Sequence, residues 1–344
     1  MIQIQKIMQK IVNHNTLTET EAFFLLEGIV NKEISDVQAA SVLSIMSHRG
    51  ETAEEIVGFV KMIRKMSNRS NQRFSHDIMD TCGTGGDGAS TFNISTAVSI
   101  ILSSLGIKVA KHGNKAVTSK SGSSDVLESL CVKVAKNHHE AESQLIKNDI
   151  AFLHAPYFHP ALKEVAHLRQ QLPFRTIFNI IGPLCNPLSP SYQLIGVSNE
   201  KTAATMATAI NMLGIKKALV VTGNDGLDEC SITDETKMYL VENGTITSFS
   251  YTPEEAGLQR GNLNEITVKN KQESAELILS IFKNKSNDSA KNIVILNAAA
   301  ALFASNRVPT IRDGVEIVQN CLRSGVAYHH LLFISKEEEK ALVN

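Results

Sequence analysis

The 344-residue chain is predicted to be an α/β protein, with a small N-terminal helical domain and a larger α/β domain that has a mostly parallel central sheet. Two observations predict this fold class. The first 70 residues show helical apolar spacing behind capping sequences, and from about residue 76 short apolar runs alternate with helical stretches. Such strand–helix–strand repeats build parallel sheets. We place the helical domain at residues 1–72, with a crossing segment near residues 165–190, and the α/β domain at residues 73–344.

Three capping boxes predict the helices of the N-terminal domain. In each, a Ser or Thr side chain caps the helix start, and a Glu or Gln one turn later caps it in return. The pairs are Thr18 with Glu21, Ser35 with Gln38, and Thr52 with Glu55. Each pair precedes an apolar pattern of helical period.

The apolar runs of the second part predict the strands of the sheet. Several are nearly continuous, as in strands that are buried on both faces of a parallel sheet. The predicted strands are residues 77–82, 107–113, 132–135, 150–156, 192–198 and 218–223. Residues 237–251 indicate an antiparallel hairpin that turns at Asn243-Gly244. Residues 292–305 indicate a strand or helix start followed by a helix.

Charge and composition exclude several classes of protein. The formal net charge of −1 gives no broad basic surface for nucleic acid or anionic membranes. No apolar run is long enough to span a bilayer, and the polar N-terminus does not read as a signal peptide. The five cysteines are far apart, which predicts reduced thiols in a cytoplasmic protein. We therefore expect a cytoplasmic protein with no nucleic-acid or membrane partner.

The stretch DTCGTGGDGASTFNIST, residues 80–96, indicates an anion-binding loop between a strand and a helix. Free backbone N–H groups and the positive end of the helix dipole meet at such a loop. The glycines also suit a plain tight turn, and they match the dinucleotide fingerprint G-x-G-x-x-G. Against a dinucleotide, the next strand ends in Lys111-His112 rather than an acid, and Asp87 lies inside the loop. An acid among loop amides favours a polyphosphate that carries Mg²⁺.

The segment from residue 111 to residue 130 indicates a second phosphate loop. It combines cations, hydroxyls and glycines at the end of a predicted strand. These residues are Lys111, His112, Gly113, Asn114, Lys115, Thr118, Ser119, Lys120, Ser121, Gly122, Ser123 and Ser124. Ligands of parallel sheets gather at the carboxyl ends of strands, so two such loops favour a binding site over a solvated surface loop.

A pair of adjacent acids, Asp228-Glu229, follows the predicted strand 218–223. Carboxylates at a turn can hold a hard cation through their oxygens. An acidic surface turn is the alternative, and the two phosphate loops upstream weigh against it because they call for a metal.

With these three pieces the chain resembles the anthranilate phosphoribosyltransferase family of tryptophan biosynthesis. The resemblance is carried by GTGGDG, FNIST, KHGNKAVTSKSGSSDVLE, HAPYFHPALKEVAHLRQQLPFRTIFNIIGPLCNP and GLDE, in this order. It implies a fold of the nucleoside phosphorylase/phosphoribosyltransferase type, an active site between the domains, and a homodimer formed through the helical domain. It also implies transfer of the phosphoribosyl group of 5-phosphoribosyl diphosphate (PRPP) to the amine of anthranilate, with Mg²⁺.

The resemblance also implies roles for single residues. PRPP would be bound by Gly83, Gly86, Asp87, Thr91, Asn93, Ile94, Ser95, Thr96, Lys111, His112, Gly113, Asn114, Lys115, Ala116, Val117, Thr118, Ser119 and Ser123. Anthranilate would be bound by Gly83, Asn114 and Arg169. A pair of Mg²⁺ ions per subunit would be held by Ser95, Asp228 and Glu229. No catalytic side chain is expected, because the aromatic amine is already neutral and positioning can supply much of the rate.

One departure and two alternatives accompany this interpretation. Lys115 stands where the family usually has arginine, which keeps the charge but loses bidentate phosphate binding. A pyrimidine-nucleoside-phosphorylase-like enzyme is one alternative, and it would have no use for anthranilate. A non-catalytic relative that binds nucleic acid is the other. The near-neutral charge and the intact Arg169, Asp228 and Glu229 argue against it.

Overall fold

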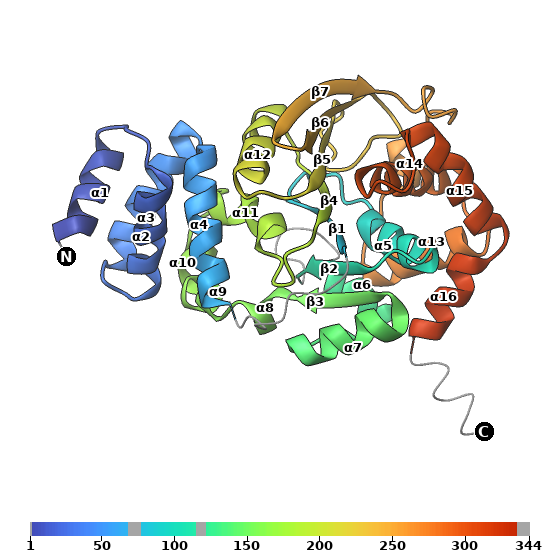
Figure 1. Ribbon diagram of the computed structural model, residues 1–344, viewed down its shortest axis with the longest axis horizontal. Helices are drawn as coiled ribbons and strands as arrows, with labels where there is room; N and C mark the ends of the chain where they lie inside the picture. Colours follow the sequence, from blue (N-terminus) through green and yellow to red (C-terminus); the bar gives the residue numbers. More distant parts are fainter. Residues whose placement is uncertain (1, 68–76, 115–121, 336–344) are drawn as a thin grey trace.

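The computed structural model describes residues 2–67, 77–114 and 122–335, and it confirms the predicted fold class (Figure 1). The N-terminal helices are α1 (Ile2–Val12), α2 (Glu19–Val30), α3 (Asp36–Arg49) and α4 (Ala53–Met66). All three predicted capping boxes are present, since Thr18, Ser35 and Thr52 each accept a hydrogen bond from the backbone N–H one turn later. These caps explain why α2, α3 and α4 begin where they do.

The described part of the α/β domain is built on one sheet of seven strands. In spatial order these are β3 (Ile150–His154), β2 (Val109–Gly113), β1 (Met79–Gly83), β4 (Tyr192–Gly196), β5 (Lys217–Gly223), β6 (Thr236–Glu242) and β7 (Thr245–Tyr251). The first five are parallel, and β6 and β7 form the predicted antiparallel hairpin. The strand order reverses between β1 and β4. Open α/β sheets bind ligands at the carboxyl ends of the strands at such a reversal.

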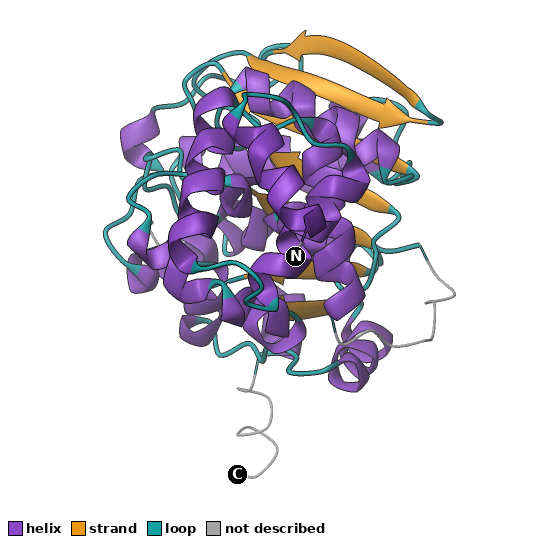
Figure 2. Cartoon of the chain, turned by 90° about the vertical axis from the view of Figure 1, so that its left-hand side faces the viewer, coloured by secondary structure: helices purple, strands orange, loops and turns teal. Residues whose placement is uncertain are grey.

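Helices cover both faces of the sheet, and Figure 2 shows them in front of the strands when the molecule is viewed from the helical-domain side. One face packs against α5 (Ile94–Ser104), α13 (Lys271–Phe282), α14 (Asp288–Ala304), α15 (Ile311–Arg323) and α16 (Val326–Ile334). The other packs against α12 (Glu200–Met212) and the helical domain. Successive strand residues point to opposite faces. Accordingly Leu194 and Leu219 belong to the first core, whereas Ile195 and Val220 belong to the second.

Three shorter elements complete the domain. They are α6 (Ser123–Ser129), α7 (His138–Asn148) and the 3-10 turn η2 (Leu263–Glu265). Ala141 and Leu145 of α7 pack with Ala151 and Leu153 of β3 in a small separate core, which covers this end of the sheet.

The chain returns to the helical domain between β3 and β4. This crossing segment contains α8 (Ala155–Phe158), α9 (Pro160–Glu164), α10 (Ala166–Gln171), α11 (Ile177–Ile180) and the 3-10 turn η1 (Gly182–Cys185). The ring of Phe178 lies 5.9 Å from the ring of Phe59 on α4, measured between centroids. Arg64 of α4 donates two hydrogen bonds to the carbonyl oxygen of Leu184, at 2.9 and 2.7 Å. The N-terminal helices and the crossing segment thus pack together into one layer, called the helical layer below. This layer includes residues from two separate parts of the chain.

The prediction of a strand at residues 132–135 is wrong. Among the described residues this segment makes only isolated bridges, from Val132 to Ser335 and from Ala135 to Leu153. It follows a turn at Cys131, whose φ is 59°, and then touches the edge strand β3 through one hydrogen bond at Ala135. A short apolar run beside a sheet edge has strand composition without strand pairing.

Residues 292–304 are helical and Ser305 is the C-cap, so the part of the prediction that allowed a strand here is wrong. Helix α14 begins at Asp288 behind the cap of Asn287. Its apolar run is buried between the sheet and the neighbouring helices, and a helix buried on all sides loses its polar face. Its sequence then resembles that of a buried strand.

The described ranges contain no helix with the length and apolar character needed to cross a membrane. All five cysteines carry free thiols, in agreement with the prediction of reduced cysteines.

A buried ion pair joins the helices of the N-terminal domain. The Glu55 carboxylate accepts hydrogen bonds from the Leu17 backbone N–H (2.9 Å), the Arg49 guanidinium (2.6 Å) and the Thr52 backbone N–H (2.9 Å). The Glu55 side chain is fully buried, and the Nε and Nη1 atoms of Arg49 are buried without a hydrogen-bond partner among the described residues. Removing this acid would leave a buried cation and a buried N–H group uncompensated.

We therefore predict that Glu55→Ala lowers the free energy of unfolding by about 3 kcal/mol, because breaking a buried pair leaves an uncompensated charge. Urea titration followed by circular dichroism measures the change. Glu54→Ala, an exposed change one position earlier on the same helix, is the control and should stay within about 0.5 kcal/mol of the parent. Equal effects of the two substitutions would contradict the structural role of the buried pair.

Candidate active site

The glycine loop, residues 84–93, connects the end of β1 to the start of α5. Gly85, Gly86 and Gly88 have φ values of 67°, 76° and 75°, a region that suits glycine because side chains with a Cβ are strained there. The loop delivers the chain to the N-terminus of α5, where the helix dipole favours anions. The strand–loop–helix arrangement that the sequence predicted is therefore present, and phosphate binding by this loop stays a prediction.

The Asp228-Glu229 turn folds back over the ends of β1 and β4. A Cβ added at Gly196 would lie 1.5 Å from the carbonyl oxygen of Asp228, and one at Gly83 would lie 2.2 Å from its carboxylate. Asp228 also accepts a hydrogen bond from the Gly85 backbone N–H at 2.6 Å. Gly83 and Gly196 are direct neighbours in the sheet, so together they form the floor on which this acid rests.

Three acids of the site lie close enough to repel one another. Burial, with a smaller contribution from the neighbouring Asp87, raises the pKa of Asp228 to about 6. Burial raises the pKa of Glu229 to about 8, with Asp228 and Asp87 adding to the shift. Clustered carboxylates that resist ionisation are suited to a divalent cation. No group of three or more His, Cys, Asp or Glu side chains in the described part of the chain could hold a metal ion, so substrate oxygens would have to complete the coordination.

Lys111 supplies positive charge next to this acidic cluster. Its side chain is buried, and its ammonium group donates hydrogen bonds to the Thr81 carbonyl oxygen and, at 3.0 Å, to the Ser95 hydroxyl. Ser95 in turn donates its backbone N–H to the Glu229 carboxylate. Burial lowers the pKa of Lys111, while the surrounding acids act in the opposite direction. Lys111 thus links the second predicted loop to the first turn of α5.

A network of buried polar side chains lies next to Lys111. Asp80 on β1 accepts hydrogen bonds from the Asn186 amide (2.8 Å) and the His112 backbone N–H (3.2 Å). Burial raises the pKa of Asp80 to about 6, and the attraction to Lys111 opposes that rise. The His112 ring lies 3.1 Å from the His159 ring between Nε2 atoms, and burial lowers the pKa of both. Asn186 and His159 were given no role from the sequence.

The remaining predicted PRPP residues occupy several environments. Ile94 and Thr96 are buried in the core on the inner side of α5, so the loop-facing groups of this turn come from Asn93 and Ser95. Asn93 is tied to α13 by hydrogen bonds with the Ser274 hydroxyl. Thr91 forms a bridge with Thr267.

At the end of β2, the Ser123 hydroxyl donates to the Asn114 carbonyl oxygen at 3.3 Å, and a Cβ at Gly113 would lie 2.1 Å from that hydroxyl. The structure therefore brings α6 against this strand end. Lys115, Ala116, Val117, Thr118 and Ser119 lie outside the described residues.

Arg169 lies on α10 of the crossing segment. Its guanidinium carbon sits 5.5 Å from the centre of the Phe178 ring, and burial lowers its pKa. Within the described residues this guanidinium makes no hydrogen bond or ion pair, so its donors are available for an anionic ligand. A half-buried arginine without an acid partner is unusual unless a ligand supplies the charge.

Arg175 is a site residue that sequence reasoning missed. It follows α10 and donates hydrogen bonds to the carbonyl oxygens of Gly85 (2.7 Å) and Gly86 (3.3 Å) in the glycine loop. Gly196 was missed as well, although it ends its apolar run as Gly83 does, and that shared position was the available signal. The local sequence contains no such signal for Arg175. Its partners in the glycine loop are backbone carbonyl groups, which every residue has.

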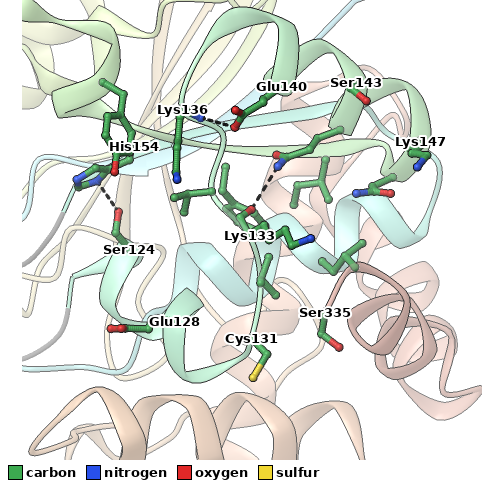
Figure 3. Close-up of a pocket in the computed structure, with 18 of the residues that line it drawn as sticks. Ser124, Glu128, Cys131, Lys133, Lys136, Glu140, Ser143, Lys147, His154 and Ser335 are labelled. Carbon is green, nitrogen blue, oxygen red and sulfur yellow. Dashed lines mark hydrogen bonds between the residues drawn. The ribbon is translucent and has the colours of Figure 1, made fainter. Parts of the chain in front are cut away.

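A large cavity of about 1100 Å³ lies elsewhere, beside β3 and α7 and next to the end of α16 (Figure 3). Lys133, Lys136 and Lys147 contribute to its lining, and Cys131 and Ser335 lie at the side formed by α6 and α16. Among the described residues, Ser124 of the second predicted phosphate loop lines it, but none of those that the family resemblance assigns to PRPP, anthranilate or Mg²⁺ does. The candidate site is therefore defined by the strand ends rather than by the size of a cavity.

Comparisons with known proteins agree with this geometry. Residues 5–67 match the model of the glycosyl transferase family helical bundle domain, and residues 75–328 match that of the a/b domain of the same family. The anthranilate phosphoribosyltransferase of Priestia megaterium is 46% identical over 95% of this chain and 96% of its own length. That of a Geobacillus species is also 46% identical, over 98% of this chain and 99% of its own length.

Solved structures give the same result. The anthranilate phosphoribosyltransferase of Thermus thermophilus has a TM-score of 0.87 at 33% identity, covering 95% of this chain and 98% of that chain. The Saccharomyces cerevisiae enzyme in complex with PRPP and Mg also has a TM-score of 0.87, at 26% identity over 96% of each chain. The fold and site thus define a two-domain glycosyltransferase with a helical bundle and an α/β domain. Within that class, the chain belongs to the anthranilate phosphoribosyltransferase family.

The raised pKa of Glu229 predicts how stability depends on pH in metal-free solution. The folded-state pKa of about 8 lies above the ordinary value of 4.5, so between these values the folded protein retains a proton that the unfolded chain has lost. The contribution of Glu229 to stability is therefore lost as pH rises through this window. Glu229→Gln removes the carboxyl group whose ionisation costs free energy in the folded protein. It should therefore stabilise the metal-free protein by at least ~2 kcal/mol at pH 8.5, with little effect near pH 4.5.

Thermal unfolding in EDTA across this pH range measures the effect. Glu276→Gln, an exposed change on α13, is the matched control and should show no such pH dependence. A constant difference between Glu229→Gln and the parent at all pH values would argue against a buried, titrating acid.

Proposed function

We propose that the protein transfers the phosphoribosyl group of PRPP to the amine of anthranilate, forming N-(5-phosphoribosyl)anthranilate and pyrophosphate in the second step of tryptophan biosynthesis. One observation carries the proposal: Asp228 is held on the glycine loop at the strand reversal, beside Glu229 and Asp87, where a diphosphate would complete the coordination of a metal by these acids. The names of the relatives agree with this activity. The comparisons give no support to a nucleoside phosphorylase or to a nucleic-acid-binding relative.

The PRPP site combines the glycine loop, the first turn of α5, the end of β2 and the start of α6. The described residues assigned to PRPP are Gly83, Gly86, Asp87, Thr91, Asn93, Ile94, Ser95, Thr96, Lys111, His112, Gly113, Asn114 and Ser123. Ser95, Asp228 and Glu229 would hold Mg²⁺, with two ions per subunit as the family resemblance implies. The S. cerevisiae enzyme, solved with PRPP and Mg, supports the metal but does not give the number of ions here.

Anthranilate is assigned to the face of Arg169, with Asn114 and Gly83 beside the reacting amine. The guanidinium can bind both oxygens of a planar carboxylate, which orients the aromatic ring and its amine. The S. cerevisiae enzyme has been solved in complex with 4-fluoroanthranilate, which is consistent with an aromatic carboxylate site in this fold.

The chemistry needs positioning and charge more than a reactive side chain. Departure of pyrophosphate leaves positive charge on the ribose and negative charge on the leaving group. When bound, Mg²⁺ neutralises the leaving diphosphate. Lys111 holds a fixed positive charge behind the first turn of α5, and the loop amides offer donors to the phosphate oxygens. The amine of anthranilate is uncharged at neutral pH, so no general base is assigned.

The assembly and location of the protein are further parts of the proposal. A homodimer formed through the helical domain is supported by apolar side chains exposed there, Val12, Phe24 and Val37. Measurement of the mass in solution tests it. A cytoplasmic location is supported by the free thiols of all five cysteines, because disulfides are rare in reducing compartments.

The activity is tested by mixing the purified protein with anthranilate, PRPP and Mg²⁺ and following the loss of anthranilate fluorescence. The proposal predicts a decay that requires PRPP and stops when EDTA removes the metal. A folded protein that shows no decay at saturating substrate would overturn the transferase assignment.

Arg169→Ala tests the anthranilate site in the same assay. Loss of the charged, bidentate contact should raise KM for anthranilate at least about tenfold, with a smaller effect on KM for PRPP. Arg169→Lys keeps the charge without the fork and should fall between the parent and the alanine variant. An unchanged KM for anthranilate in both variants would show that the carboxylate binds elsewhere.

A further inference from the structure

Arg175 connects three parts of the molecule that are distant in the sequence. Its guanidinium donates hydrogen bonds to the carbonyl oxygens of Gly85 and Gly86 at 2.7 and 3.3 Å, and to the Ser198 hydroxyl at 3.0 Å. Its own carbonyl oxygen accepts a hydrogen bond from the Ser47 hydroxyl of α3 at 2.6 Å. The glycine loop, the chain after β4 and the helical domain therefore meet at this one residue.

Gly85 is held through both of its backbone polar groups. Its N–H donates to the Asp228 carboxylate at 2.6 Å, and its carbonyl oxygen accepts from Arg175 at 2.7 Å. Each backbone unit of a loop can present either a donor or an acceptor to a ligand. With the carbonyl oxygens of Gly85 and Gly86 bound to Arg175, their lone pairs are directed to a cation and away from an incoming anion.

The guanidinium of Arg175 lies close to Gly86. A Cβ added at Gly86 would lie 2.8 Å from a terminal nitrogen of Arg175, and the φ of Gly86 is 76°. Arg175 is exposed, so the end of its side chain could move away from such a Cβ, and the requirement for glycine at position 86 comes from the backbone φ. The position of the guanidinium is therefore set by its three hydrogen bonds.

Arg175 also shares the crossing segment with Arg169, the residue assigned to the anthranilate carboxylate. Its backbone is fixed to α3 through Ser47, whereas its side chain is fixed to the phosphate loop. A displacement of the helical layer would thus be transmitted to the glycine loop through a short chain of hydrogen bonds. This route does not pass through the hydrophobic core.

We propose that Arg175 is a positioning residue for the diphosphate: it orients the carbonyl groups of Gly85 and Gly86 away from the substrate and ties the phosphate loop to the helical layer that carries Arg169. It contacts no reacting atom. This inference rests on the proposed transferase activity, and it adds a residue that the family resemblance did not assign.

The test compares Arg175→Met and Arg175→Lys with the parent protein in the fluorescence assay. Arg175→Met keeps an unbranched side chain but removes every donor, and it should raise KM for PRPP at least about tenfold while KM for anthranilate changes less than about twofold. Arg175→Lys can still donate to one carbonyl oxygen and should be intermediate. Ser47→Ala, which leaves the guanidinium in place, should raise KM for PRPP by a smaller factor.

Arg323→Ala on α15 is the matched control. Among the described residues its guanidinium bonds only to Asn320 of the same helix, so the change should leave both KM values unchanged. A second readout is the thermal stabilisation of each variant by PRPP with Mg²⁺, measured against the ligand-free protein. Arg175→Met should lose most of this stabilisation while its ligand-free melting temperature stays near that of the parent.

The outcomes separate this inference from the proposed function. An active parent with an unchanged KM for PRPP in Arg175→Met would overturn the positioning role alone. So would a KM that rises equally for both substrates, or an Arg175→Lys variant as impaired as Arg175→Met. An inactive parent that PRPP and Mg²⁺ do not stabilise would overturn the transferase function instead. If Arg175→Met does not fold, Arg175→Lys and Ser198→Ala test the same contacts.

Discussion

The contact between the Asp228 turn and the paired glycines at the ends of β1 and β4 is the constraint on which the site depends. A side chain at either Gly83 or Gly196 would displace Asp228, because the space is already filled by its backbone or carboxylate. The contact brings the loop after β5, which carries these adjacent acids, onto the loop after β1. Without it, the glycine loop would still offer its amides to an anion, but of the three acids only Asp87, which lies inside the loop, would remain beside it.

The same contact holds several acids close together, and their repulsion lowers the stability of the folded protein when no cation is bound. The carboxyl groups of Asp228 and Glu229 lie beside Asp87, and their pKa values are raised first by desolvation and then by the mutual repulsion of these acids. Lys111 offsets part of this repulsion, and it is itself held in place by Ser95 and the network around Asp80. A site with unfavourable charges before its ligand arrives gains stability when a cation and a polyphosphate bind. Function and stability therefore favour different side chains at position 229.

Local sequence signals predicted the parts of the structure that local physics determines. The caps at Thr18, Ser35 and Thr52, the turn at Asn243-Gly244 and the glycine loop were all visible because backbone geometry restricts the residues there. The segment 132–135 was mistaken for a strand because composition cannot show whether an edge has a partner. Arg175 was missed because its ligands are carbonyl oxygens, which every residue has, and only the fold shows which of them lie nearby.

The crossing segment has a consequence for how such a protein can evolve. The helical layer takes Phe178 and its neighbours from a part of the chain that lies between two strands of the sheet. An exchange of the first 70 or so residues for those of a distant relative would therefore mismatch a shared interior, even if both pieces were well folded in their own contexts. The two halves have to change together. Inheritance of the whole chain as one unit, rather than shuffling of modules, is the history that this interleaving favours.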